Sequence, residues 1–479
     1  MPEIELKLDI TPEALETLKA SGLFSGPSGT VVQRSIYFDT RDNRLEKKGF
    51  SLRIRRSGDA LAQTVKATGR ASSVFVRSEW EMPVMAEEPV VDSTTPLASE
   101  FGNFAGELMP RFAVNVVRQT WEVMENKACI EVSADQCEVI AEERRLSLYE
   151  LELELKEGET TDLFRLARKI ETIIPVKINV QSKAEQGYRL LDAAPAAVRA
   201  ELLCLEADDT AEQAFRMIVG SCFRQFRLNE VILLRRRNAG AALHQARVAL
   251  RRLRSAFAVF KTHLGDEAER LSDEFRWLAG MLGEARDLDV LEIEAAAPAL
   301  HEKLRTARKA AYEAAIAALL SSRSRALVID FNEWLQSGSY RQESALNKPV
   351  VDFARDALNK RRRKLKVHGK HLAALTDDER HQVRKDAKKL RYAAEFFRSL
   401  FDGKRRSRRF MRFSRMMESL QEQLGALNDL VAGPAIAEKC GLGDLVQSGS
   451  RTRADDKAKL IERSQAMLDE LLDAKRFWH

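Results

Sequence analysis

Short segments in the first 190 residues place fully charged side chains at every second position. Glu3, Glu5 and Lys7 alternate with apolar residues in the first segment, as Arg53 and Arg55 do in a later one. Successive side chains of a strand point to opposite faces, so each segment predicts a strand with one charged and one apolar face. Further strand-like segments contain Lys66, Glu79 and Glu81, Arg118, Asp135, Glu150, Glu152 and Glu154, and the alternating residues Lys177, Asn179, Gln181 and Lys183.

Residues of these types could handle a metal–phosphate complex. Carboxylates two positions apart on a strand lie ~6–7 Å apart, close enough to share or flank a hard cation such as Mg²⁺ or Mn²⁺. Arginine and lysine match phosphate oxygens. Hydrolysis would then need a positioned water and stabilisation of the developing charge. All seven histidines follow residue 240, so the first half must use carboxylates, Lys, Arg and Tyr.

The elements that carry these side chains predict a closed sheet. One charged face is usually the solvated side of an antiparallel sheet. At least six segments here carry charges of both signs on one face, and their apolar faces must be buried. A barrel with a charged interior and helices outside satisfies both conditions. Helices are expected at residues 11–23, with Thr11 as N-cap and Pro12 in the first position, and at residues 160–174.

The ordered motifs of residues 1–200 resemble the CYTH superfamily of triphosphate tunnel metalloenzymes. The resemblance implies an eight-stranded antiparallel tunnel that acts on triphosphates with Mg²⁺ or Mn²⁺. The motifs that carry it are Glu3-x-Glu5-x-Lys7, Tyr37-Phe38-Asp39-Thr40, Leu52-Arg53-Ile54-Arg55, Lys66, Glu79-x-Glu81, Arg118, Asp135, Glu152-Leu-Glu154-Leu and Ser182-Lys183.

The same resemblance implies a role for each matching residue. The expected metal ligands are Glu3, Glu5, Asp135, Glu152 and Glu154. The residues expected to hold phosphates are Arg53, Arg55, Lys66, Arg118 and Lys183. Lys7, paired with Tyr37, would orient the substrate near the scissile bond, and Glu79 and Glu81 would complete the acidic wall and help to position water. The ligand pair could instead be Glu150 and Glu152. We prefer Glu152 and Glu154, because this pair is followed by an apolar residue and then by the end of the strand.

The second half has helical periodicity and an internal repeat. His244, Arg247, Arg251 and Arg254 recur at an offset of 137 as His381, Arg384, Lys388 and Arg391, and a Leu-Gly-x-x-x-Asp-Leu element ending at Leu288 recurs at an offset of 142. The spacing places each basic set on one helical stripe, next to an apolar stripe that should pack. Aligned cations repel one another unless an anion relieves them, so a linear polyanion is a suitable ligand; the alternative is a solvated basic surface.

These residues resemble the CHAD domain, an α-helical module of two pseudo-symmetric bundles. The resemblance covers residues 210–479, with copies at approximately 210–345 and 346–479, and implies that the basic stripes bind inorganic polyphosphate. The expected fold class is therefore α+β: an N-terminal eight-stranded antiparallel β-barrel with flanking helices at residues 1–200, followed by an all-α domain.

Charge and composition limit the expected partners and the expected localisation of the protein. Residues 1–200 contain 26 Lys and Arg and 32 Asp and Glu, a net charge of −6, whereas residues 201–479 contain 52 and 40, a net charge of +12. The basic stripes hold few aromatic residues, so nucleic acid is not expected as a partner. The N-terminus lacks signal-peptide features, no apolar run of ~18 residues predicts a membrane span, and five cysteines without CxxC spacing fit a cytoplasmic protein.

The expected function is metal-dependent hydrolysis of inorganic triphosphate to pyrophosphate and phosphate, with polyphosphate binding by the second half. A class IV-type adenylate cyclase and a thiamine triphosphatase are alternatives. A non-enzymatic polyphosphate-binding protein is a third, although a barrel without activity need not retain the acidic set Glu3, Glu5, Glu152 and Glu154.

Overall fold

The structure is a computed structural model that describes residues 4–24, 28–67, 78–102, 104–236, 239–294, 298–439 and 450–479. The chain forms two compact units. The first contains Met1–Ala196 and Leu320–Gly338, and the second contains Ala197–Leu319 and Ser339–His479.

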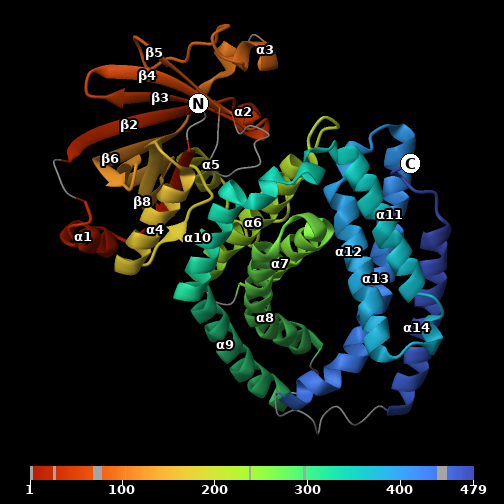
Figure 1. Cartoon of the computed structure of the whole chain (residues 1–479). Coiled ribbons are helices and arrows are strands. Elements are labelled where there is room, and N and C mark those ends of the chain that lie inside the picture. Colours follow the sequence, from red (N-terminus) through yellow and green to blue (C-terminus); the bar gives the residue numbers. More distant parts are fainter. Residues whose placement is uncertain are drawn as a thin grey trace. The chain divides into compact units, whose positions relative to one another are not determined.

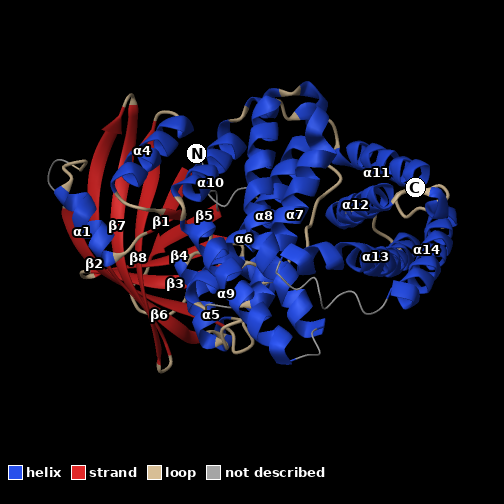
Figure 2. Ribbon diagram, turned by 90° about the horizontal axis from the view of Figure 1, so that it is seen from below, coloured by secondary structure: helices blue, strands red, loops and turns tan. Residues whose placement is uncertain are grey.

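One antiparallel sheet of nine strands forms the centre of the first unit (Figure 1, Figure 2). The strands lie in the order β5-β4-β3-β2-β6-β7-β8-β1-β9. Their bounds are β1 Ile4–Asp9, β2 Gly29–Asp39, β3 Phe50–Ser57, β4 Ala60–Ala67, β5 Ser78–Pro83, β6 Met109–Glu125, β7 Ala128–Ala141, β8 Arg144–Glu157 and β9 Lys177–Ile178.

The expected alternation of charged and apolar faces is present. In β1, Leu6 and Leu8 are fully buried while Glu5 and Lys7 on the opposite face are half-buried. The expectation of a closed eight-stranded barrel is not confirmed. The sheet has nine strands, and β5 and β9 are its edges, with no pairing between them among the described residues. Closure would require long edge strands that can pair, and β9 has two residues.

Helices α4 (Thr160–Ile173) and α5 (Lys183–Leu191) pack against β6, β7 and β8. The expected helices at 11–23 and 160–174 are confirmed as α1 (Pro12–Ala20) and α4, and the Thr11 hydroxyl caps α1 by accepting from the Ala14 amide at 3.2 Å. The remaining helices of this unit are α2 Arg44–Lys47, α3 Leu97–Phe101 and α10 Ser322–Ser337.

The alternating residues 177–183 do not form a continuous strand. Pairing with β1 ends at Ile178, and α5 begins at Lys183. Ser182 is the reason, because its hydroxyl accepts from the Glu185 amide at 3.1 Å while the Glu185 carboxylate accepts from the Ser182 amide at 2.7 Å. This capping box starts a helix where period-two alternation predicted a strand.

Helix α10 belongs to the first unit although it lies far along the chain. It packs against α4 and β9. Arg168 of α4 forms ion pairs with Asp330 (2.8 Å) and Glu333 of α10, and Arg325 of α10 pairs with Glu171 at 2.5 Å. The first unit is therefore assembled from two separate stretches of the chain.

The second unit is built from helices (Figure 2), as the periodicity predicted. The apolar stripe next to the first basic stripe is buried at Leu243, Ala246, Leu250, Leu253 and Phe257. Among the described residues, no helix is long and apolar enough to cross a membrane. The helices are α6 Ala211–Arg235, α7 Gly240–Phe260, α8 Asp266–Glu294, α9 Pro298–Leu320, α11 Val350–His368, α12 Asp377–Phe396, α13 Lys404–Lys439 and α14 Ser450–Asp473.

The ion pairs of Arg168 give a test of the place of α10. We expect Arg168→Ala to lower the free energy of unfolding by about 1 kcal/mol, the upper end for a partly exposed ion pair, because one guanidinium binds two carboxylates. Urea unfolding would measure the coupling energy between Arg168 and the two carboxylates. The variants needed are Arg168→Ala, the double variant Asp330→Ala/Glu333→Ala and the triple variant.

Arg165→Ala is the matched control, since Arg165 pairs with Asp162 of its own helix. Equal losses for Arg165→Ala and Arg168→Ala, with no coupling between Arg168 and the two carboxylates, would contradict the attachment of α10 through this network.

Candidate functional site

The first unit contains a charged cavity of about 290 Å³. It is lined by residues from β1 to β8 and from the start of α5, so strands near both edges of the sheet border the same space. Glu3 lies outside the described residues. The other residues predicted for this half all line the cavity: Glu5, Lys7, Tyr37, Arg53, Arg55, Lys66, Glu79, Glu81, Arg118, Asp135, Glu152, Glu154 and Lys183.

The pairing of β1 with β8 sets the acidic part of the wall. Glu5 lies opposite Glu154, and Lys7 lies opposite Glu152. Glu150, two positions earlier, is 1% exposed, is bound by Lys183 and is not part of the lining. The register therefore favours Glu152 and Glu154 as the pair that faces the cavity, and leaves Glu150 beneath it.

Glu152 is the centre of a charge network. Its carboxylate binds Lys7, Arg118 and, at 2.9 Å, Lys183. Burial alone would raise the pKa of Glu152, but these cations outweigh it and hold the pKa well below the usual range. Burial would likewise lower the pKa of Lys7, and the carboxylates of Glu152 and Glu5 instead raise it. Both groups are therefore charged at neutral pH.

A second cationic group lies on β3 and β4. Lys66 Nζ is 2.6 Å from a Glu79 oxygen and Arg53 is 4.0 Å from Glu79, while Thr64 donates to Glu81 at 3.1 Å. The Arg53 Nε atom is buried without a hydrogen-bond partner among the described residues. A buried, unsatisfied guanidinium nitrogen is costly.

Tyr37 is placed differently from its expected partnership with Lys7. Its ring stacks on Phe112 with centroids 4.7 Å apart, and the residue is 4% exposed. The hydrogen bonds of Lys7 run to Glu5, at 3.0 Å, and to Glu152. Tyr37 is thus part of the cavity floor and of the core beneath it.

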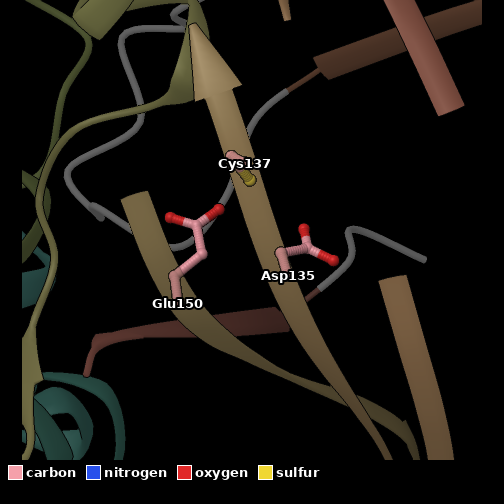
Figure 3. Close-up of side chains that lie close together, drawn as sticks. All are labelled: Asp135, Cys137 and Glu150. Atoms are coloured by element: carbon pink, nitrogen blue, oxygen red, sulfur yellow. The ribbon is translucent and has the colours of Figure 1, made fainter. Parts of the chain in front are cut away.

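Asp135, Cys137 and Glu150 form the one group of possible metal-binding side chains found among the described residues, with one ligand atom from each within 4.8 Å of the others (Figure 3). Burial raises the pKa of the Cys137 thiol to about 12, so it stays protonated. Asp135 is bound by Arg118 at 2.6 Å and Lys183 at 2.8 Å, and Glu150 is bound by Lys183. This group does not fit a hard cation, and Asp135 would have to exchange its partners to act as a ligand.

The carboxylates that face the cavity differ from this group in donor type. Glu5, Glu152 and Glu154 offer only oxygen donors, the set that Mg²⁺ and Mn²⁺ prefer. Like Asp135, Glu152 would have to exchange its cationic partners to act as a ligand. Burial and the neighbouring Glu152 carboxylate raise the pKa of Glu5. A cation between these groups would relieve that repulsion and favour ionised Glu5.

Asp39 is a supporting residue to which the sequence assigned no role. It is fully buried and accepts from the amides of Leu45 at 2.9 Å and Glu46 at 3.0 Å, and from the Tyr188 hydroxyl at 2.8 Å. These bonds join the end of β2 to α2 and α5. The Tyr-Phe-Asp-Thr motif was the available signal, but a motif does not reveal that its aspartate holds elements together.

The second unit contains a larger cavity, of about 1060 Å³, lined by both copies of the basic stripe. From α7 it includes Arg247, Arg251 and Arg254, and from α12 it includes His381, Arg384 and Lys388. The predicted residues His244 and Arg391 lie on the same helices but are not part of the lining. The two stripes, 137 residues apart in the sequence, therefore border one space.

Positive charge accumulates in this cavity. Burial, together with Arg251, Arg384 and Arg391, lowers the pKa of Lys388 to about 7. Burial and nearby arginines also lower the pKa of His244. Its counterpart in the second copy, His381, has its Nδ1 atom 2.5 Å from Asn428 Oδ1. An anion would relieve the repulsion that disfavours charged Lys388.

Parts of the chain are similar to several known proteins. An inorganic triphosphatase of Haemophilus influenzae is 30% identical over 202 residues, which cover 40% of this chain and 55% of that protein, so the chain spans about half of its length. A CHAD domain structure from Ricinus communis is 28% identical over 58% of this chain and 97% of its own, with a TM-score of 0.47. A Hippeastrum protein described by a dominant triphosphatase activity is 20% identical over 39% of this chain and 95% of its own, with a TM-score of 0.30.

The family matches fall on the two halves of the chain. Residues 1–188 match the CYTH domain, and residues 217–437 match the CHAD domain. These bounds contain the charged cavity of the sheet and both basic stripes. The chain therefore carries a CYTH domain followed by a CHAD domain.

Proposed function

We propose that the CYTH domain hydrolyses inorganic triphosphate to pyrophosphate and phosphate with Mg²⁺ or Mn²⁺, and that the CHAD domain binds polyphosphate. The observation that carries the first part is the convergence of carboxylates and cations from seven strands and the start of α5 on one cavity. The curved sheet would surround the substrate as a tunnel wall. The likeness to the Haemophilus inorganic triphosphatase also supports this activity.

In this proposal each part of the wall has its own task. Glu5, Glu152 and Glu154, with Glu3 beside them in the sequence pattern, would hold the metal, which supplies charge neutralisation on phosphate oxygens when bound. Arg53, Arg55 and Lys66 would bind the oxygens at the opposite wall. Lys7, held by Glu5 and Glu152, would orient the phosphate nearest the acids, and Glu79 and Glu81 would position water.

Arg118 and Lys183 have a different part in this arrangement. Both are tied to Asp135 and Glu152 by ion pairs. They can contribute positive potential to a bound phosphate, and with Lys7 they hold the pKa of Glu152 well below its usual range. We therefore propose that they act chiefly by positioning Glu152 and Asp135.

The lining favours inorganic triphosphate over a nucleotide or thiamine ester. Its apolar members are small, Val114, Val116, Val180 and Ala184, and its one aromatic residue, Tyr37, is stacked on Phe112. A base or thiazole ring would need an apolar or aromatic surface of its own. Among the described residues, the lining consists mainly of charged and polar side chains instead.

The CHAD proposal depends on the shared cavity of the two stripes. Arg247, Arg251 and Arg254 span eight residues of α7, which is about 10 Å along a helix. An extended anion can contact several of these cations at once and reach those of α12. A single phosphate cannot, so the cavity favours a polymer.

Product release with and without metal tests the enzymatic proposal. We expect phosphate and pyrophosphate from inorganic triphosphate only when Mg²⁺ or Mn²⁺ is present, with at least about a hundredfold lower kcat/KM for ATP and thiamine triphosphate. Cyclic AMP would be measured in the ATP sample. If cyclic AMP were the main product, the domain would be a cyclase and not a hydrolase. If none of the substrates were turned over, the proposed activity would be wrong and the protein would be a binding protein.

Glu5→Gln tests the metal-ligand assignment. Loss of one carboxylate oxygen should lower kcat/KM by at least about a hundredfold. Replacing a residue that only hydrogen-bonds to a metal ligand already lowers metal affinity or activity about 10–100-fold. A higher Mg²⁺ concentration should restore part of the rate. Glu131→Gln is the control, because Glu131 lies opposite Glu154 on β7 but outside the lining. Full activity of a folded Glu5→Gln variant would contradict the assignment.

Substitution of the shared basic residues tests the polyphosphate proposal. Replacing Arg247, Arg251, Arg384 and Lys388 with Ala should weaken binding of long-chain polyphosphate by at least about a hundredfold and flatten its salt dependence. Isothermal titration calorimetry at several salt concentrations measures both.

The control removes four exposed arginines outside the lining, namely Arg305, Arg363, Arg408 and Arg412. If both quadruple variants lose the same affinity, binding depends on total charge and the cavity is not the site. The melting temperature verifies folding of each variant.

A further inference from the structure

Three carboxylates lie side by side on neighbouring strands at the acidic wall of the sheet cavity. The register places Glu131 of β7 opposite Glu154 of β8, and Glu154 opposite Glu5 of β1. Glu5 and Glu154 belong to the cavity lining, whereas Glu131 does not. Like charges directly opposite one another destabilise a sheet, so this row needs cations beside it.

Two lysines on the same strands supply these cations. Lys7 follows Glu5 by two residues on β1, and its Nζ atom lies 3.0 Å from Glu5 Oε1. Lys156 follows Glu154 by two residues on β8, and its Nζ atom lies 2.8 Å from Glu154 Oε1. Within the part of the chain that the structure describes, neither carboxylate has a second ion pair. One oxygen of each carboxylate is therefore bound by a lysine, and the other is available to a cation.

Lys156 also contacts the outer acid of the row. Its Nζ atom lies 3.6 Å from Glu131 Oε1, so one ammonium group bridges Glu131 and Glu154. The Lys156 side chain is 40% exposed and is not part of the cavity lining. Lys156 therefore neutralises the two acids from outside the cavity and occupies one oxygen of each.

The number of oxygens that a site offers separates Mg²⁺ from Ca²⁺. Mg²⁺ demands near-ideal octahedral geometry, keeps several waters and is usually held by one or two carboxylates. Ca²⁺ takes about six to eight oxygens in a flexible shell and accepts both oxygens of a single carboxylate. A wall that offers one oxygen from Glu5 and one from Glu154 meets the first requirement better than the second.

We propose that Lys156 determines the metal specificity of the cavity, because it limits Glu154 to one available oxygen and keeps Glu131 out of the site, which favours Mg²⁺ over Ca²⁺. This inference rests on the metal site proposed for Glu5, Glu152 and Glu154. Lys156 is a positioning residue in this role, since it acts through two carboxylates. Loss of its charge strengthens the binding of both cations, but Ca²⁺ gains more, because its larger shell can take in the released oxygens.

Lys156→Met tests this role, because methionine has a similar length but cannot bind a carboxylate. Mn²⁺ bound to the full chain without substrate is measured by electron paramagnetic resonance, and Mg²⁺ or Ca²⁺ is titrated to displace it. The ratio of the Kd for Ca²⁺ to the Kd for Mg²⁺ should fall by roughly tenfold, the lower end for residues that hold metal ligands. Adding Glu131→Gln to this variant should reverse part of the fall.

Lys156→Arg and Lys127→Met are the controls. Arginine keeps the charge and can bind both carboxylates, so Lys156→Arg should retain the wild-type ratio. Lys127 is an exposed residue in the turn between β6 and β7, outside the lining, and Lys127→Met removes the same amount of charge. It should also retain the wild-type ratio. An equal fall in Lys127→Met and Lys156→Met would overturn the specificity role, because total charge would then account for it.

Inhibition of Mg²⁺-dependent triphosphate hydrolysis by Ca²⁺ is the second measurement. The inhibitory Ca²⁺ concentration should be roughly tenfold lower in Lys156→Met than in the wild-type protein. Unchanged selectivity in both measurements, with a wild-type protein that binds metal, would overturn the specificity role alone. If the wild-type protein neither binds Mn²⁺ nor shows metal-dependent hydrolysis, the proposed metal site is wrong and the role of Lys156 with it.

Discussion

The compensation of buried charge around Glu152 is the constraint on which the first unit depends. Three cations, Lys7, Arg118 and Lys183, surround this carboxylate and come from β1, β6 and α5. Removing one partner of a buried ion network typically costs about 3–5 kcal/mol, because the remaining charge is left unpaired. The strand register, the early end of β9 and the capping box of α5 together bring these side chains into contact. A site prepared for both cations and anions follows from the same arrangement.

The two units handle anions in different ways. The sheet cavity balances its charges internally, so its carboxylates and cations are close to neutral as a set, and a metal with its phosphate can replace the internal pairs. The helical cavity has an excess of cations in its lining, and acids such as Asp287 neutralise it only in part. In the functions proposed above, the first arrangement would hold a small substrate at fixed points, and the second would bind a flexible polymer at many interchangeable points.

Helix α10 shows that position in the sequence and position in the fold differ. It follows the first basic stripe in the chain, yet its Asp330 and Glu333 neutralise Arg168 of α4. Residues that precede and follow α10 belong to the second unit. Periodicity identified the segment as a helix but gave no sign of its partner, since the apolar face of a helix does not specify what it packs against.

The sequence by itself determined the period-two charged faces, the helices α1 and α4, the helical second half and the two basic stripes. Those features are local, because alternation and spacing fix which face a residue occupies. Tertiary structure decided the rest. It left the sheet open at β5 and β9, engaged Asp135 with Arg118 and Lys183, placed Tyr37 against Phe112, and put His244 outside the basic cavity. These outcomes depend on contacts between distant segments, which compete for the same charged and apolar groups and which no local pattern encodes.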